Sequence, residues 1–303
     1  MDLAHLDYIL YIARERSITR AAEKLFVTSS ALNQQLQKLE GELGTALFIR
    51  NRSDWQLTPA GEVYVEAARE ILNIRETACQ RIAELGDLAS RQYRVGLIPE
   101  RGVDMFTAIY PQFHRRFPEV ILEPQECNVR AMQKLISDGE IDLGLITLTE
   151  CQKDGNVYHH MADEEIFLAV PAGHPLAGQG CRMPEQAPEI PLEMFREEAF
   201  ILIFQASTMY QLTRELFDQA GFEPRVLFST SSNISKFRMV RAGVGCALLP
   251  AVFALPDEGI VYFRLPGHPQ WQIHMCSRRG AYLGAAMTGY LELCREYWKG
   301  KFG

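Results

Sequence analysis

The first 45 residues contain three segments in which apolar side chains recur every three or four positions. That spacing places them on one face of an α-helix. The second segment runs from Ser17, its expected N-cap, to Leu25, and three residues later the third segment begins. This spacing predicts a helix-turn-helix. The expected apolar faces are Leu3, Leu6, Leu10 and Ala13 in the first segment, and Leu32, Leu36, Leu39 and Leu43 in the third, Thr28–Gly44.

A short hairpin is expected after the third helix. The apolar runs ALFIR and WQLT are separated by the polar stretch NRSD. Short apolar runs on either side of a turn rich in Asn, Ser and Asp predict two antiparallel strands. A hairpin directly after a helix-turn-helix is a wing.

A long helix is expected next. Thr58 is a suitable cap and Pro59 suits the first helical position, and the helical pattern continues to about Ala89. Its apolar side chains alternate between spacings of three and four, with one break at Arg81. Such a heptad seam predicts pairing with a second chain, and packing on its own domain is the alternative. The expected dimerisation residues are Tyr64, Ala67, Ile71, Ile74, Ala78 and Leu85.

From Tyr93 onwards, strand-like runs alternate with helical segments. The first round runs from YRVGLI to EEIFLAV and the second from AFILIF to GCALLP. The chain ends with GIVYFRL, WQIHMCS and a helix from about Tyr282 to Trp298. This alternation predicts a parallel α/β sheet in two halves, which binds ligands at the carboxyl ends of its strands.

Composition and charge restrict the class of protein. The 303 residues, 47% hydrophobic and 23% charged, suit two or three folded domains. No apolar run approaches the roughly 18–20 residues of a membrane span. The N-terminus carries Asp2 and Asp7 instead of the basic segment of a secretory signal, so we expect a cytoplasmic protein without membrane contact. The net charge of −7 opposes a nonspecific nucleic-acid coat but permits a small DNA-reading module.

The cysteines do not suggest a disulfide framework or a metal site. The chain has seven, widely scattered and without a CxxC pair. We expect reduced, mostly buried thiols, with a redox sensor as the alternative.

The stretch Arg16–Glu62 resembles the signature of LysR-type transcriptional regulators. The resemblance rests on the alanine pair Ala21–Ala22, the runs LQKLEGELG and LTPAG, and the later AGVGCALLP. It implies an α/β multidomain protein with a winged helix-turn-helix, a long linker helix and a bilobed α/β effector domain of the type 2 periplasmic-binding-protein kind. It further implies a regulator of promoter DNA that assembles as a dimer of dimers and is controlled by a small molecule bound between the lobes. RNA polymerase is a further candidate partner.

The implied domains follow the pattern changes along the chain. The DNA-binding domain is expected at residues 1–60, the linker and dimerisation helix at 61–91, and the effector domain at 92–303. Within the last, subdomain I is expected at about 92–162 and 268–303, and subdomain II at about 163–267.

The third helix departs from the family pattern where it would meet DNA. The usual start resembles Ser-Gln-Pro-Ala-Leu-Ser-Arg, whereas this chain reads TSSALNQ. Asn and Gln suit bidentate contacts to adenine, and hydroxyls at a helix start suit phosphate. A solvated helix face is the alternative. We expect base readout by Asn33, Gln34 and Gln37 and phosphate contacts by Ser29 and Ser30.

Basic side chains of this module are scarce. Residues 1–62 carry seven Lys and Arg side chains against eight Asp and Glu, a net charge of −1. We therefore expect weak, salt-sensitive binding by the isolated module. The expected backbone contacts are Arg20 and Lys24 near the helix-turn-helix, and Arg50 and Arg52 in the wing.

Candidate effector residues follow the strands and open the helices of the α/β region. Free N–H groups and hydroxyls at helix starts favour an anion, which suggests a small carboxylate or an amino-acid-like ligand, although simple helix capping also explains each Ser and Thr. The candidates are Pro99, Glu100, Arg101, Thr147, Thr149, Gln205, Ser207, Thr208, Ser229 and Ser231.

The chain shows no catalytic or metal-binding motif. His159-His160 has no nearby ligand spacing, and Glu164-Glu165 would face opposite sides of a strand. We expect no enzyme activity, no metal and no cofactor beyond an effector of unknown identity. A solute-binding protein and an α/β enzyme are the alternative functions. The N-terminal module argues against a solute-binding protein, and the lack of a catalytic constellation argues against an enzyme.

Overall fold

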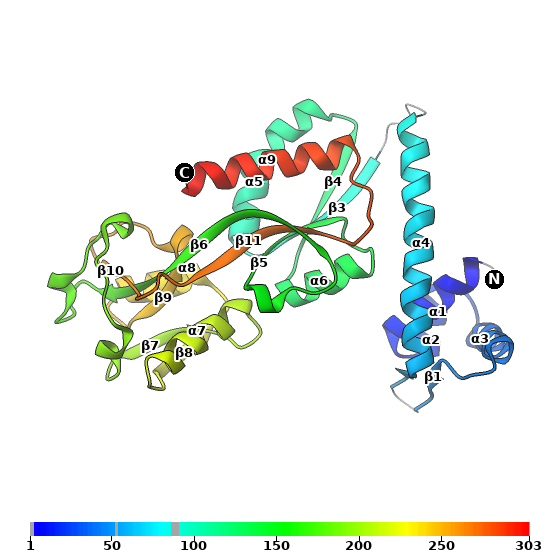
Figure 1. The fold of residues 1–303 in the computed structure, drawn as a ribbon, viewed down its shortest axis with the longest axis horizontal. Helices are drawn as coiled ribbons and strands as arrows, with labels where there is room; N and C mark the ends of the chain where they lie inside the picture. Colours follow the sequence, from blue (N-terminus) through cyan, green and yellow to red (C-terminus); the bar gives the residue numbers. More distant parts are fainter. Residues whose placement is uncertain (1–2, 52–53, 86–90, 303) are drawn as a thin grey trace. The chain divides into compact units, whose positions relative to one another are not determined.

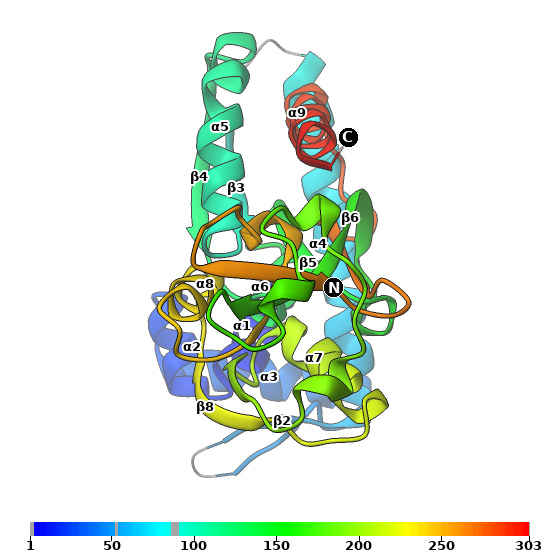
Figure 2. The same ribbon diagram turned by 90° about the vertical axis from the view of Figure 1, so that its left-hand side faces the viewer.

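The computed structural model describes residues 3–51, 54–85 and 91–302. The chain forms two compact units, drawn from two sides in Figures 1 and 2. The N-terminal unit comprises residues 1–88 and 280–282, and the C-terminal unit comprises 89–279 and 283–303. Within the described ranges, no helix combines the length and the apolar composition that a membrane span requires.

The N-terminal unit begins with three helices, α1 (Leu3–Glu15), α2 (Ile18–Lys24) and α3 (Ser29–Leu43). The Ser17 side chain accepts a hydrogen bond from the backbone N–H of Arg20, and the Thr28 side chain accepts one from that of Ala31. Helix α3 ends at Gly44, whose φ of 70° is readily adopted only by glycine. These caps set the boundaries of α2 and α3, and the predicted helix-turn-helix is confirmed.

The packing of these helices corrects two expectations. Leu32, Leu36 and Leu39 are buried as predicted, but Leu43 is 45% exposed because α3 ends there. In α1 the buried stripe is Leu6, Ile9 and Ile12, while the predicted Leu10 and Ala13 are only half-buried. Both stripes of α1 have helical spacing, so contact with α3 and the following long helix decided between them.

The predicted wing and long helix are both present. Strands β1 (Phe48–Ile49) and β2 (Gln56–Leu57) pair antiparallel, and α4 runs over Pro59–Leu85. A Cβ at Gly61 would lie 2.1 Å from the Leu47 carbonyl oxygen, so the hairpin can pack on the first turn of α4 only if glycine stands there. Residues 86–90, which include the expected end of this helix near Ala89, lie outside the described residues.

The surface of α4 has two different apolar sides. Val65 and Ala68 are buried in the N-terminal unit. Of the predicted seam, Tyr64 and Ile71 are half-buried, whereas Ala67, Ile74 and Ala78 are exposed. The Leu85 side chain lies outside the described residues.

The C-terminal unit has two lobes. Lobe I contains β3 (Arg91–Leu97), α5 (Arg101–Arg116), β4 (Val120–Glu126), α6 (Val129–Ser137), β5 (Leu143–Leu148) and α9 (Ala285–Phe302). Strand β3 pairs parallel with β4 and with β5, and α9 packs against α5 (Figures 1 and 2). Lobe II contains β7 (Ala199–Ile203), α7 (Thr208–Gln219), β8 (Arg225–Thr230), α8 (Asn233–Arg241), β9 (Ala247–Pro250) and β10 (Ile260–Arg264).

Short 3₁₀ turns complete the unit: η1 (Glu150–Gln152), η2 (Ala177–Gln179), η3 (Pro184–Gln186), η4 (Leu192–Phe195) and η5 (Ala251–Phe253).

Two long strands, β6 (Val157–Pro171) and β11 (Gln270–Ser277), connect the lobes (Figure 1). They pair antiparallel with each other, and the sheet order is β10-β6-β11-β5-β3-β4, with β9 alongside β6. The expected parallel sheet in two halves is therefore a mixed sheet, in which the strands that connect the lobes run antiparallel. The chain enters lobe II through β6 and returns through β11, so these strands run in opposite directions. The predicted parallel pairing holds for β3, β4 and β5, and for β7 and β8.

Candidate functional site

Helix α3 presents a polar surface opposite its buried leucines. Ser30, Gln34 and Gln37 are exposed, and Ser29 and Asn33 are half-buried. The buried leucines fix the rotation of α3 about its axis, so the amides and hydroxyls point away from the core. The five predicted DNA-reading residues therefore share an accessible side of one helix.

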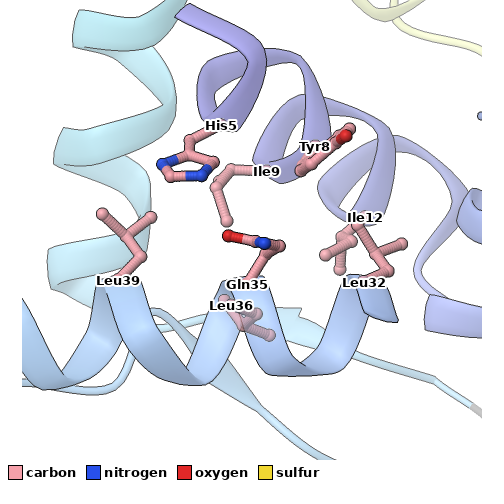
Figure 3. A pocket seen from close by; sticks show the side chains of 8 residues that line it. All are labelled: His5, Tyr8, Ile9, Ile12, Leu32, Gln35, Leu36 and Leu39. Atoms are coloured by element: carbon pink, nitrogen blue, oxygen red, sulfur yellow. The ribbon is translucent and has the colours of Figure 1, made fainter. Parts of the chain in front are cut away.

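Gln35 is exposed but lies on the side of α3 that faces α1, not on that polar surface. A small hollow lies between the two helices, and Figure 3 shows Gln35 projecting from α3 toward α1. The hollow is formed by the core contacts of the helix-turn-helix. Its lining is His5, Tyr8, Ile9 and Ile12 from α1, and Leu32, Gln35, Leu36 and Leu39 from α3.

The predicted basic residues differ in how far their side chains are engaged in contacts within the protein. Arg50 forms an ion pair with Glu40 of α3, and the other carboxylate oxygen of Glu40 accepts a hydrogen bond from the Leu47 N–H at 2.8 Å. The Arg50 guanidinium lies 5.4 Å from the centre of the Trp55 ring. Arg50 therefore holds the wing against α3. Arg20 donates to the Glu15 backbone oxygen, and Lys24 is exposed. Arg52 lies outside the described residues.

A second candidate site is a pocket at the carboxyl ends of the strands in the C-terminal unit. Its cavity volume is about 140 Å³, which is below the roughly 300–1,000 Å³ of pockets for drug-sized ligands and restricts it to a smaller molecule. Both lobes contribute to its lining: Ile98, Pro99, Glu100, Arg101, Asn128, Val129, Thr147 and Trp271 from lobe I and β11, and Ile203, Phe204, Ala206, Ser207, Thr208, Ser231 and Asn233 from lobe II.

Seven of the ten predicted effector residues line this pocket: Pro99, Glu100, Arg101, Thr147, Ser207, Thr208 and Ser231. The other three lie elsewhere. Thr149 caps η1, Gln205 is exposed in the loop before α7, and Ser229 is exposed on β8. The sequence reasoning missed Asn128, although it follows β4 and caps α6 just as Ser207 caps α7. Trp271 had no local signal, because the return of β11 from lobe II brings it to the pocket.

Direct hydrogen bonds join the lobes beside the pocket. The Thr208 hydroxyl donates to the Thr147 carbonyl oxygen at 2.8 Å, and the Gln152 amide donates to the Thr208 carbonyl oxygen at 3.0 Å. Glu100 from lobe I accepts hydrogen bonds at the start of α8, from the Ser232 hydroxyl at 2.6 Å and the Asn233 N–H at 3.1 Å. Polar contacts therefore join the two lobes beside the pocket.

Arg101 is buried and forms an ion pair with the buried Glu164. Its guanidinium also lies 5.0 Å from the centre of the Trp271 ring, which favours a cation by its π-face. One nitrogen, Nη2, is buried without a hydrogen-bond partner. Glu165, the next residue, is half-buried and lies beside His268, so the two adjacent glutamates do face different surroundings as predicted.

The two neighbouring histidines lie in different surroundings. His160 is exposed and lies 3.1 Å from Asp163, whereas His159 is half-buried beside Ser277. Burial, together with the charge of Arg295, lowers the pKa of His159. In the described part of the chain, no three His, Cys, Asp or Glu side chains are grouped to hold a metal ion.

Comparisons with known proteins agree with this arrangement. Residues 3–62 match the bacterial regulatory helix-turn-helix of the lysR family, and residues 86–299 match the LysR substrate binding domain. The chain is 27% identical to the uncharacterised HTH-type regulator YcgK of Bacillus subtilis over the whole chain and 96% of the relative. It is 26% identical to the DNA-binding transcriptional dual regulator OxyR of Escherichia coli over the whole chain and 97% of the relative.

Solved structures of full-length regulators share the fold. A variant of OxyR from Pseudomonas aeruginosa superposes with a TM-score of 0.66 at 25% identity, covering 99% of this chain and 95% of that one. BenM superposes with a TM-score of 0.58 at 22% identity, covering 99% and 98%. With both of its modules matched over nearly their full length, the chain belongs to the LysR family of DNA-binding transcriptional regulators.

Proposed function

We propose that the protein recognises promoter DNA through the polar side of α3. Asn33, Gln34 and Gln37 would contact base edges, and Ser29 and Ser30 at the start of the helix would contact phosphate. The observation that carries this proposal is the accessible row of amides and hydroxyls held outward by the buried leucines. A structural neighbour, CbnR, was solved in complex with its target DNA, which supports the same kind of partner here.

The proposed active form is an oligomer, a dimer of dimers, in which α4 pairs with α4 of a second copy. The exposed side of α4 carries Ile74 and Ile82, which are 69% and 67% exposed. Exposed isoleucines along a helix favour burial against another apolar surface. Pairing also doubles the phosphate contacts, which offsets the net charge of −1 of each DNA-binding module.

The proposed effector is a small organic acid or an amino-acid-like molecule bound in the pocket between the lobes. Support comes from the small pocket lined by both lobes, the unpartnered Arg101 Nη2 and the helices α7 and α8, which begin there. Some relatives are named hydrogen peroxide-inducible genes activators. Among the described residues that line this pocket none is cysteine. Of the seven thiols, Cys246, Cys276 and Cys294 are buried, whereas Cys79 and Cys151 are exposed, so the expectation of mostly buried thiols was wrong. The lining of the pocket favours a reversible ligand over thiol oxidation at this site.

The remaining elements of the proposal follow from this role. Such a regulator acts in the cytoplasm, where its promoter lies, contacts RNA polymerase there and catalyses no reaction of its own. A solute-binding role alone would not account for the helix-turn-helix of the N-terminal unit.

Two experiments test the proposal. A gel shift with the DNA upstream of its own gene should show specific binding that weakens steeply with salt. A matched fragment of shuffled sequence is the control, and equal affinity for both fragments would contradict sequence readout. For the effector, thermal shift across a metabolite panel should show stabilisation by carboxylates, and stabilisation by cations or neutral sugars alone would contradict the proposed ligand class.

A further inference from the structure

The Glu100 carboxylate occupies the start of helix α8. It accepts hydrogen bonds from the Ser232 hydroxyl at 2.6 Å and from the N–H groups of Asn233 and Ile234 at 3.1 and 3.3 Å. Free N–H groups and the helix dipole make the first turn of a helix a place for an anion. Here the anion belongs to the protein itself and comes from the opposite lobe.

The backbone around Glu100 is arranged for this contact. Its φ of 65° and ψ of −88° lie near a strained γ-turn, a conformation that non-glycine residues rarely adopt. Glu100 also stands at the N-cap position of α5, yet its side chain makes no capping hydrogen bond there. The residue therefore adopts a strained backbone and leaves its own helix uncapped, while its carboxylate crosses to lobe II.

The surroundings of this carboxylate carry positive charge. Arg101 lines the same pocket, is 3% exposed and has an unpartnered Nη2. Lys236, one turn into α8, is buried, and its side-chain nitrogen lies 2.7 Å from the Leu248 carbonyl oxygen. Glu164 balances Arg101, so removal of the Glu100 carboxylate would leave the Ser232 hydroxyl and the Asn233 N–H at the start of α8 without their acceptor. A carboxylate from the protein or from a ligand can serve as that acceptor.

We propose that Glu100 is a tethered competitor of the effector: its carboxylate fills the anion site at the start of α8 and holds the lobes together until a small carboxylate displaces it. This inference rests on the proposed regulation by an effector in this pocket. The exchange of one carboxylate for another conserves the charge of the pocket while breaking a link between the lobes. It also lowers the affinity for carboxylates, because only the fraction of molecules with Glu100 displaced can bind them.

Acetate is the probe, because Glu100→Ala removes a CH₂–COO⁻ group that acetate can replace. In the full-length protein, hydrogen exchange of the segment 229–241 should be at least about tenfold faster in Glu100→Ala than in the wild type. Acetate, compared with chloride at equal ionic strength, should restore the protection and raise the Tm of this variant in a saturable way. The wild type should respond at least about tenfold more weakly to the same acetate concentrations.

Two further variants make the result decisive. Glu100→Gln keeps the size and one acceptor oxygen without the charge, so it should bind acetate more tightly than the wild type even if Glu100→Ala folds poorly. Glu126→Ala removes an exposed carboxylate at the end of β4 and should behave as the wild type. The proposal would be overturned if both Glu100 variants showed the wild-type rate of hydrogen exchange in the segment 229–241. It would also be overturned if acetate did not slow this exchange in Glu100→Ala. The measurements contain no DNA, so their outcome is independent of the gel shift that tests promoter binding.

Discussion

The buried carboxylate of Glu164 links three parts of the C-terminal unit. It pairs with Arg101 at the start of α5, accepts the Trp271 indole N–H of β11 at 2.6 Å and accepts the Val252 N–H of η5 at 2.9 Å. Glu164 is 0% exposed and Arg101 3% exposed. Loss of this carboxylate would leave a cation and two N–H groups buried without an acceptor.

The expected cost of Glu164→Gln is large for a single substitution. Breaking a buried ion pair by removing one partner typically costs about 3–5 kcal/mol, because the other charge stays buried and uncompensated. For a domain of this size that corresponds to a fall in Tm of roughly 10 °C. The neighbouring Glu165→Gln is the matched control, since the pairs of Glu165 with the partly exposed Arg264 and His268 should each contribute no more than about 1 kcal/mol.

Urea denaturation of the full-length protein, at one fixed protein concentration, measures the loss of stability in Glu164→Gln and in Glu165→Gln. The double variant Arg101→Met/Glu164→Leu replaces the pair by apolar side chains and should lose less stability than Glu164→Gln, since neither charge is then left alone. Equal stabilities for Glu164→Gln and Glu165→Gln would refute the reasoning. So would a double variant whose loss of stability equals the sum of the losses in Arg101→Met alone and Glu164→Leu alone.

Three further predictions concern other parts of the chain. Gln34→Ala should relax the base preference in a binding-site selection, whereas Lys24→Ala should weaken binding to all DNA sequences alike and reduce the slope of log affinity against log salt by about one. The opposite result for the two variants would assign base readout to Lys24 and phosphate contact to Gln34. Burial lowers the pKa of Lys236 from 10.5 to about 7, so between these values the unfolded chain holds a proton that the native chain lacks and stability rises with pH. Relative to Lys236→Met, wild-type stability in urea denaturation should therefore rise by about 1.4 kcal/mol per pH unit from pH 7 to 9, and a flat difference would contradict a depressed pKa. Leu36→Ala in the buried face of α3 should cost about 2–5 kcal/mol in the unfolding of the DNA-binding module, and a loss below about 1 kcal/mol would show a loosely packed core.

Predictions from local sequence were reliable where capping residues mark the ends of a helix. Thr28 and Gly44 limit α3, and Ser17 begins α2, because a cap and a left-handed glycine act within one turn of the helix. The same rules placed seven of the ten effector candidates at the pocket, since the chain turns from strand to helix at polar residues. They failed for the exposed Leu43 and for the buried stripe of α1, where helical spacing alone permits more than one side to face the core.

The sequence by itself determined the family, the helix-turn-helix with its wing and the alternation of strands and helices, since periodicity, caps and signature residues are local properties. Only the tertiary structure decided which residues from distant segments meet. Strand β11 brings Trp271 to Glu164, separated by 107 residues, and Glu100 reaches Ser232 across 132 residues. Such contacts depend on how two lobes close around antiparallel strands, and no local pattern encodes that geometry. A glutamate that the sequence predicts to line the effector pocket thus lies, in three dimensions, with its carboxylate hydrogen-bonded to the start of α8 in the opposite lobe.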